Sequence, residues 1–79
     1  MPVFYFDYDD GQGRGPVLDQ VGTELADIDA AIIEASHAMA EVAADAIPGS
    51  SARALGILVR DELGATRLRV SLDYRVETN

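Results

Sequence analysis

The sequence contains no cysteine, no tryptophan and no lysine, and these absences exclude several kinds of chemistry. Without cysteine the chain forms neither disulfides nor thiolate zinc sites. Without lysine it cannot carry a phosphate loop of the Gly-Lys-Ser/Thr type. No apolar run approaches the ~20 residues of a membrane span. No basic residue precedes the N-terminal apolar stretch, as a signal peptide would require. We therefore expect a cytoplasmic protein without membrane partners.

The composition that is present predicts one small folded domain over residues 1–79. The chain is 48% hydrophobic and 25% charged, which is near the globular average, so disorder is not expected. A domain of this length buries only about 60–65% of the surface that its unfolded chain exposes. Small domains commonly gain the missing stability from disulfides, metals or a partner chain. Oligomerisation, or good packing of the helix on the sheet, is therefore the expected supplement here.

The net charge of −8 is unevenly distributed along the sequence. Residues 1–50 carry ten acidic residues and one arginine, whereas residues 51–79 carry four acidic residues and five arginines. An acidic chain is poorly suited to bind nucleic acid, because the phosphates must be neutralised by cations. Separated charges of opposite sign instead favour contacts with proteins.

Hydrophobic periodicity predicts a strand followed by a long helix. The strand covers residues 3–8 and ends in an Asp-, Gly- and Pro-rich turn over residues 9–16, after which residues 17–19 form a possible short returning strand. Asp27 is the predicted N-cap of the helix, and Pro48 is expected to end it. The predicted inward stripe consists of Leu25, Ile28, Ile32, Ala35, Met39, Val42 and Ala46.

Two further strands are predicted over residues 54–62 and 66–77, joined by a turn that contains Gly64. Strict alternation in the second strand separates apolar from polar side chains. The expected fold is therefore α+β and two-layered. One long helix packs on a small, mostly antiparallel sheet of three main strands plus a possible short fourth, in the order β-(β)-α-β-β. We expect the C-terminal strand, as the longest, to lie at the centre.

The acidic and glycine-rich stretch DYDDGQGRG raises the question of a metal or phosphate site. An EF-hand loop needs oxygen ligands at positions 1, 3 and 5 and glycine at position 6, and neither register of this stretch fits. A phosphate loop would lead directly into a helix, but Pro16 and about ten further residues intervene before the helix. A polar turn is the favoured interpretation. Asp7, Asp9 and Asp10 remain the candidates for weak binding of calcium or a small ligand.

No arrangement of residues indicates catalysis. His37 is the only histidine, and its neighbour Ser36 points about 100° away on the helix, so no nucleophile–base pair forms locally. The acidic residues at 27, 34, 41 and 45 form a ridge on a solvated helix face, which lacks the cleft that acid–base chemistry needs. We expect neither an enzyme nor a cofactor.

Three groups of residues are candidates for protein contacts. Val3 and Tyr5 belong to a strand that is apolar on both faces, one of which has no cover in a two-layer fold. Ile33 and His37 belong to a third, mildly apolar helix stripe. Arg67, Arg69 and Arg75 line the polar face of the last strand. These features predict a non-enzymatic interaction module that forms a homodimer. The alternatives are an antitoxin-like or regulatory protein that binds a larger basic partner, and the weak ligand or calcium binder.

Several segments resemble a family of short, mostly stand-alone bacterial proteins that is catalogued as a domain of unknown function. The resemblance is carried by FYFD at residues 4–7, by V-x-D-x-x-G-T-E-L at 17–25, by DIDAA at 27–31 and by V-R-D-E-x-G at 59–64. A proline commonly follows the GTEL segment in that family, where this chain has Ala26. The resemblance covers nearly the whole chain and implies no reaction, cofactor or catalytic residue.

Overall fold

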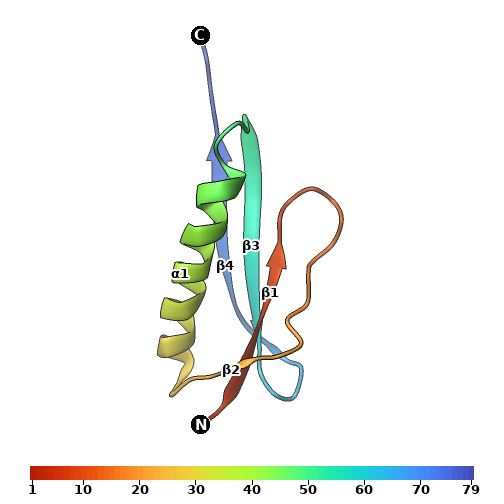
Figure 1. Ribbon diagram of the computed structural model, residues 1–79, viewed down its shortest axis with the longest axis vertical. Coiled ribbons are helices and arrows are strands. Elements are labelled where there is room, and N and C mark those ends of the chain that lie inside the picture. Colours follow the sequence, from red (N-terminus) through yellow and green to blue (C-terminus); the bar gives the residue numbers. More distant parts are fainter.

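The computed structural model describes residues 1–79 as one helix lying on one face of a four-stranded antiparallel sheet (Figure 1). The strands are β1 (Val3–Asp9), β2 (Thr23–Glu24), β3 (Ala52–Arg60) and β4 (Thr66–Arg75), and the helix is α1 (Ile28–Ala46). The predicted two-layer α+β fold and its element order are confirmed. The helix does not have the length and apolarity that a membrane span requires.

The sheet order is β2-β1-β3-β4, so the C-terminal strand lies at an edge and our expectation of a central position is wrong. The central pair is β1 and β3. Leu55, Ile57 and Val59 of β3 are all buried, whereas β4 alternates between exposed and half-buried residues. The prediction was wrong because it took the length of a strand as a sign of its position in the sheet. Burial on both faces distinguishes a central strand, and in β3 Gly56 is buried on the face away from the helix.

The helix begins and ends where the sequence predicts. The Asp27 carboxylate accepts a hydrogen bond from the backbone N–H of Ala30 at 2.9 Å, which satisfies one of the free amides of the first turn. Asp29 also lies in the first turn, near the positive end of the helix dipole. The last helical residue is Ala46, and Pro48 follows two positions later.

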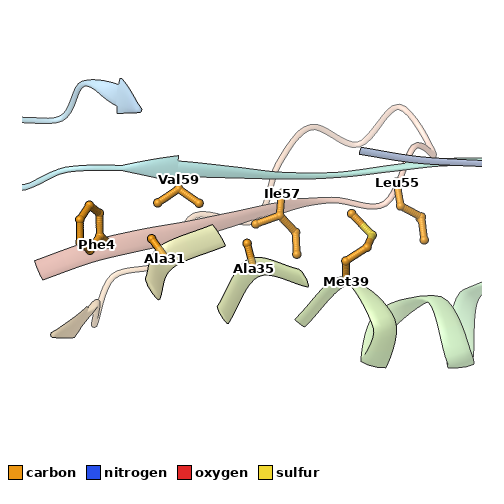
Figure 2. Packing of buried hydrophobic residues seen from close by; sticks show 7 residues of the cluster. All are labelled: Phe4, Ala31, Ala35, Met39, Leu55, Ile57 and Val59. Carbon is orange, nitrogen blue, oxygen red and sulfur yellow. The ribbon is translucent and has the colours of Figure 1, made fainter. Parts of the chain in front are cut away.

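The core lies between α1 and β3, with β1 at one side. Two alanines of the helix face the sheet directly, and Figure 2 shows Ala35 beneath Ile57 and Met39 beneath Leu55. The fully packed cluster consists of Phe4, Ala31, Ala35, Met39, Leu55, Ile57 and Val59. Small side chains at the contact let the helix backbone approach the sheet closely.

The predicted inward stripe is wrong at one position, since Ile32 is 44% exposed and Ala31 is buried in its place. The sequence Ile28, Ala31, Ala35 satisfies the same helical spacing as Ile28, Ile32, Ala35. Ile32 lies about 60° around the helix from Ala35 and therefore falls on the flank of the contact.

The connection between β1 and β2 runs back along the edge of β1 and makes β1 an interior strand. Tyr8 and Val17 exchange two backbone hydrogen bonds of 2.9 and 2.7 Å, and further along Phe4 is paired with Thr23. Between these points the Asp19 carboxylate accepts the N–H of Phe6 at 3.1 Å, in place of a backbone carbonyl. The possible short strand at 17–19 is thus a single bridge, and the regular pairing comes later, at β2.

Gly22 lets this connection pass closely over β1. Its φ of +78° lies in the left-handed region, and a Cβ on this residue would stand 2.6 Å from Cγ1 of Val3 and 2.9 Å from Cε1 of Tyr5. A Cβ here would therefore force the Val3 or Tyr5 side chain to shift. The position therefore requires glycine for two separate reasons.

We expect Gly22→Ala to lower the free energy of unfolding by about 2–4 kcal/mol, since backbone strain and a steric clash add together. Gly13→Ala is the matched control, because Gly13 has the same φ of +78° but no atom within 4 Å of its added Cβ. The control should lose only about 1–2 kcal/mol. Urea unfolding measures both, and equal losses would contradict the close approach.

Candidate interaction site

A buried ion pair occupies the face of the sheet away from the helix. Asp7 is only 3% exposed. Its Oδ2 lies 2.6 Å from Nε of Arg60, and its Oδ1 lies 3.0 Å from Nη2 of the same guanidinium. The pair is bidentate, which is the strongest geometry for an arginine and a carboxylate. It joins β1 to β3 by their side chains as well as by their backbones.

Asp19 extends the pair to the β1–β2 connection. Its backbone N–H donates to Oδ1 of Asp7 at 2.9 Å, and its carbonyl accepts from Nη2 of Arg60 at 3.1 Å. Its carboxylate accepts the N–H groups of Phe6, Val21 and Gly22. Every buried side-chain polar atom of the chain has a hydrogen-bond partner. The network is complete in itself.

The charges in this network stabilise one another. The hydrogen bond from Arg60 lowers the pKa of Asp7 below its usual value, against the opposing effect of burial. Burial disfavours the charged form of Asp19, but the three backbone N–H donors outweigh it, and the pKa of Asp19 is lowered too. The hydrogen bond to Asp7 raises the pKa of Arg60. Both carboxylates are therefore ionised near neutral pH.

The stretch DYDDGQGRG is a turn closed by its own aspartates. Oδ1 of Asp9 accepts the N–H of Gly11 at 2.9 Å, and Oδ1 of Asp10 accepts the N–H of Gln12 at 2.9 Å. Asp10 also pairs with Arg14 at 2.8 Å. Asp7 is turned away to Arg60, so the three candidate aspartates do not converge. No group of three His, Cys, Asp or Glu residues in the chain is placed to hold a metal ion.

The second face of the aromatic strand has more cover than the sequence suggested. The guanidinium of Arg60 lies 5.1 Å above the ring of Tyr5, and Gly22 lies directly against Val3 and Tyr5. Both side chains are half-buried. The expectation of an uncovered face is wrong, because the long β1–β2 connection passes over it.

The remaining candidate residues are exposed in two separate places. Ile33, which is 61% exposed, and His37 lie on α1 and point away from the sheet. Arg67, Arg69 and Arg75 lie on β4. Arg67 pairs with Asp61 at 3.6 Å, whereas Arg69 and Arg75 form no ion pair. The structure therefore does not bring the helix candidates and the arginines together.

A shallow hollow of about 290 Å³ lies on the outer face of the sheet beside Arg69. Gly56 lines the hollow, and the Arg69 guanidinium lies over it, with Nη2 3.6 Å from the point where a Cβ would stand. Asp9 borders the hollow on β1, and Ser71 and Asp73 border it on β4. The polar face of β4 thus carries both charge signs close together.

The feature that sequence reasoning missed is the open edge of β4. Ten residues form this strand, and only β3 pairs with it. The N–H of Val76 donates to the backbone carbonyl of Ser51 at 2.8 Å. The even-numbered residues of β4 therefore direct their backbone N–H and C=O groups toward β3. By alternation, the backbone groups of Arg69, Ser71 and Asp73 point to the free edge. The strict alternation of the sequence predicted the strand but not its position in the sheet.

An apolar helix flank lies beside this edge. The helix rests on β3 and β4 and runs in the same direction as β4 (Figure 1). Its right-handed turn places Ile32, Ser36 and Ala40 on the flank nearest the open edge, and all three are exposed. The same turn places Glu34 and Glu41 on the opposite flank, nearest β1. We call the β4 edge together with Ile32, Ser36 and Ala40 the edge surface.

The match to a known family covers almost the whole of this architecture. The sequence model described as Domain of unknown function (DUF6894) matches residues 3–73, which span the helix and nearly all of the sheet. The chain belongs to the DUF6894 family. The resemblance noted in the sequence is thereby confirmed. No curated protein and no solved structure gives a significant match to this DUF6894 domain.

Replacing Asp7 by asparagine should destabilise this DUF6894 domain by about 2–3 kcal/mol at pH 7, since the substitution leaves the Arg60 charge without its partner. The wild type should also lose stability in acid. The contribution of Asp7 is fully present above the ordinary Asp pKa of about 3.9 and is lost as the pH falls through its lowered folded pKa.

Urea unfolding from pH 7 down to pH 2 measures this effect, and Asp7→Asn should show a shallower acid loss than the wild type. Glu34→Gln is the control, because Glu34 is exposed and forms no ion pair. Equal acid dependence of the wild type and Asp7→Asn would show that the pair does not stabilise the fold.

Proposed function

We propose that this DUF6894 domain is a non-enzymatic protein-interaction module that self-associates through the edge surface. The observation that carries the proposal is the open edge of β4, with ten residues and an apolar helix flank beside it. Unpaired backbone groups along a regular strand are a template for pairing with another chain. Its acidity and its lack of cysteine suit the cytoplasm, where we propose that it acts.

The two ends of the sheet differ in a way that supports this choice. At the other end β2 has only two residues, and a side chain, Asp19, occupies part of the pairing positions along β1. A short and irregular edge is protected against pairing with another chain. No proline or bulge interrupts β4 between Leu68 and Arg75. The only register shift lies at its start, near Thr66.

The small core gives a reason for association. Its cluster contains only seven buried residues, and two of them are alanines. Leu68, Val70 and Leu72 remain only half-buried on the helix side of β4. A second chain at this edge would remove more of their apolar surface from water, at about 25 cal/mol per Å².

The first test is the mass of the pure protein in solution. Sedimentation velocity across micromolar concentrations should show a reversible change from monomer to dimer. Amide hydrogen exchange at Arg69, Ser71 and Asp73 should slow as the dimer forms, because their N–H groups point to the free edge. A monomer at every concentration would refute the proposal.

Replacing Ile32 by aspartate should weaken self-association by roughly tenfold or more, since a charge would replace an apolar contact of about 1.5–3 kcal/mol. Its fold should be retained, because the side chain is already 44% exposed. Val21→Asp is the matched control, since Val21 is 87% exposed on the β1–β2 connection, away from the edge surface. Equal effects of the two substitutions in sedimentation would exclude the helix flank from the interface.

A further inference from the structure

We propose that a second copy of this chain binds the edge surface in one register, with β4 antiparallel to β4 about a two-fold axis at Ser71. Arg69 of each copy then lies opposite Asp73 of the other. The inference rests on the proposed function and adds the geometry of the contact. It follows from the charges, the backbone groups and the helix position.

The charges on β4 are self-complementary about Ser71. Arg69 and Asp73 lie two residues to either side of Ser71, and their side chains share the outer face of the sheet. Both are exposed, and neither forms an ion pair within the chain. A two-fold axis at Ser71 brings each Arg69 against an Asp73, so that one contact produces two ion pairs.

The ends of the paired strands tolerate this register. Arg67 of one copy would lie opposite Arg75 of the other, which is a like-charge contact. The charge of Arg67 is already offset by Asp61, whose Oδ2 lies 3.6 Å from Nη1 of Arg67. The repulsion is therefore confined to the two ends of the paired strands and is partly neutralised by Asp61.

The backbone groups fit the same register. Arg69, Ser71 and Asp73 are the residues whose N–H and C=O groups point to the free edge. In an antiparallel pair, residues directly opposite one another with such groups exchange two hydrogen bonds. The pairing of 69 with 73, of 71 with 71 and of 73 with 69 uses all of these groups.

Pairing of the strands would also bring the two helices together. Neighbouring strands lie about 4.8 Å apart, and α1 rests on both β3 and β4. Two such helices, one on each side of the new strand pair, would lie about 10 Å apart, which is the usual distance for packed helices. The new strand pairing and the apolar flank are therefore covered by the same partner.

The flanks of the two helices are complementary in shape where the two-fold axis at Ser71 passes between them. Ser71 pairs with Gly56, which lies between Ile57 and Leu55, and these two residues lie above Ala35 and Met39 (Figure 2). The axis therefore crosses the helices between positions 35 and 39. Ala43 is half-buried and lies eleven residues after Ile32, which places it on the same flank of the helix. Ile32 of one copy then lies beside Ala43 of the other, so that a large side chain meets a small one.

Charge exchange tests the register. Asp73→Arg should weaken the dimer by roughly tenfold or more, because it places two arginines opposite each other at two sites. Arg69→Asp should weaken it similarly. The double substitution Arg69→Asp with Asp73→Arg should restore dimerisation, since each ion pair is re-formed with its charges exchanged. Glu34→Arg is the control for the change in net charge and should leave the dimer intact.

Sedimentation velocity and thermal unfolding of these proteins, and of the further double variant Arg67→Asp with Asp73→Arg, distinguish the outcomes. A monomeric wild type would overturn the proposed function and this inference together. A wild-type dimer that withstands Asp73→Arg, or that the double substitution does not restore, would leave self-association standing and overturn this register. Restoration instead by Arg67→Asp with Asp73→Arg would also overturn it, because that pair meets when the axis lies at Val70.

Discussion

The bidentate contact between Asp7 and Arg60 determines how three separate segments are assembled. It joins the two central strands, and Asp19 attaches the β1–β2 connection to the same two charges. A buried carboxylate without this guanidinium would be strongly unfavourable, so the segments must come together as a unit. Once they do, the connection covers the edge of β1. The open edge of the sheet is then on the opposite side, at β4.

Much of the fold could be predicted because local patterns determine it. Periods of two and of three to four residues identified every main element, and Asp27 and Pro48 marked the ends of the helix. The predictions that were wrong concern choices between patterns that fit the sequence equally well. Ile32 and Ala31 both satisfy helical spacing, and only the closeness of the helix to the sheet decides between them. Strand order likewise depends on contacts between residues far apart in the chain.

The candidate site was harder to predict for the same reason. Asp7 was grouped with Asp9 and Asp10 as a candidate ligand of a cation. The available signal for a different role was its position inside the predicted apolar strand over residues 3–8. Its partner Arg60 is 53 residues away, and no spacing rule connects them. Val3 and Tyr5 looked uncovered because the path of residues 10–22 cannot be derived from composition. The open edge of β4 was not predicted because this strand, as the longest, was expected at the centre of the sheet.

The tip of the β1–β2 connection differs from both of its anchored ends. Gly13 and Gly15 have open space around them, while the Tyr8–Val17 bridge and the turns made by Asp9 and Asp10 hold the base of the loop. The entropy of closing a loop rises only slowly with its length. Evolution can therefore lengthen or recompose this tip while the scaffold stays unchanged. A change in this tip would also leave the edge surface untouched, because β3 separates β1 from β4 in the sheet.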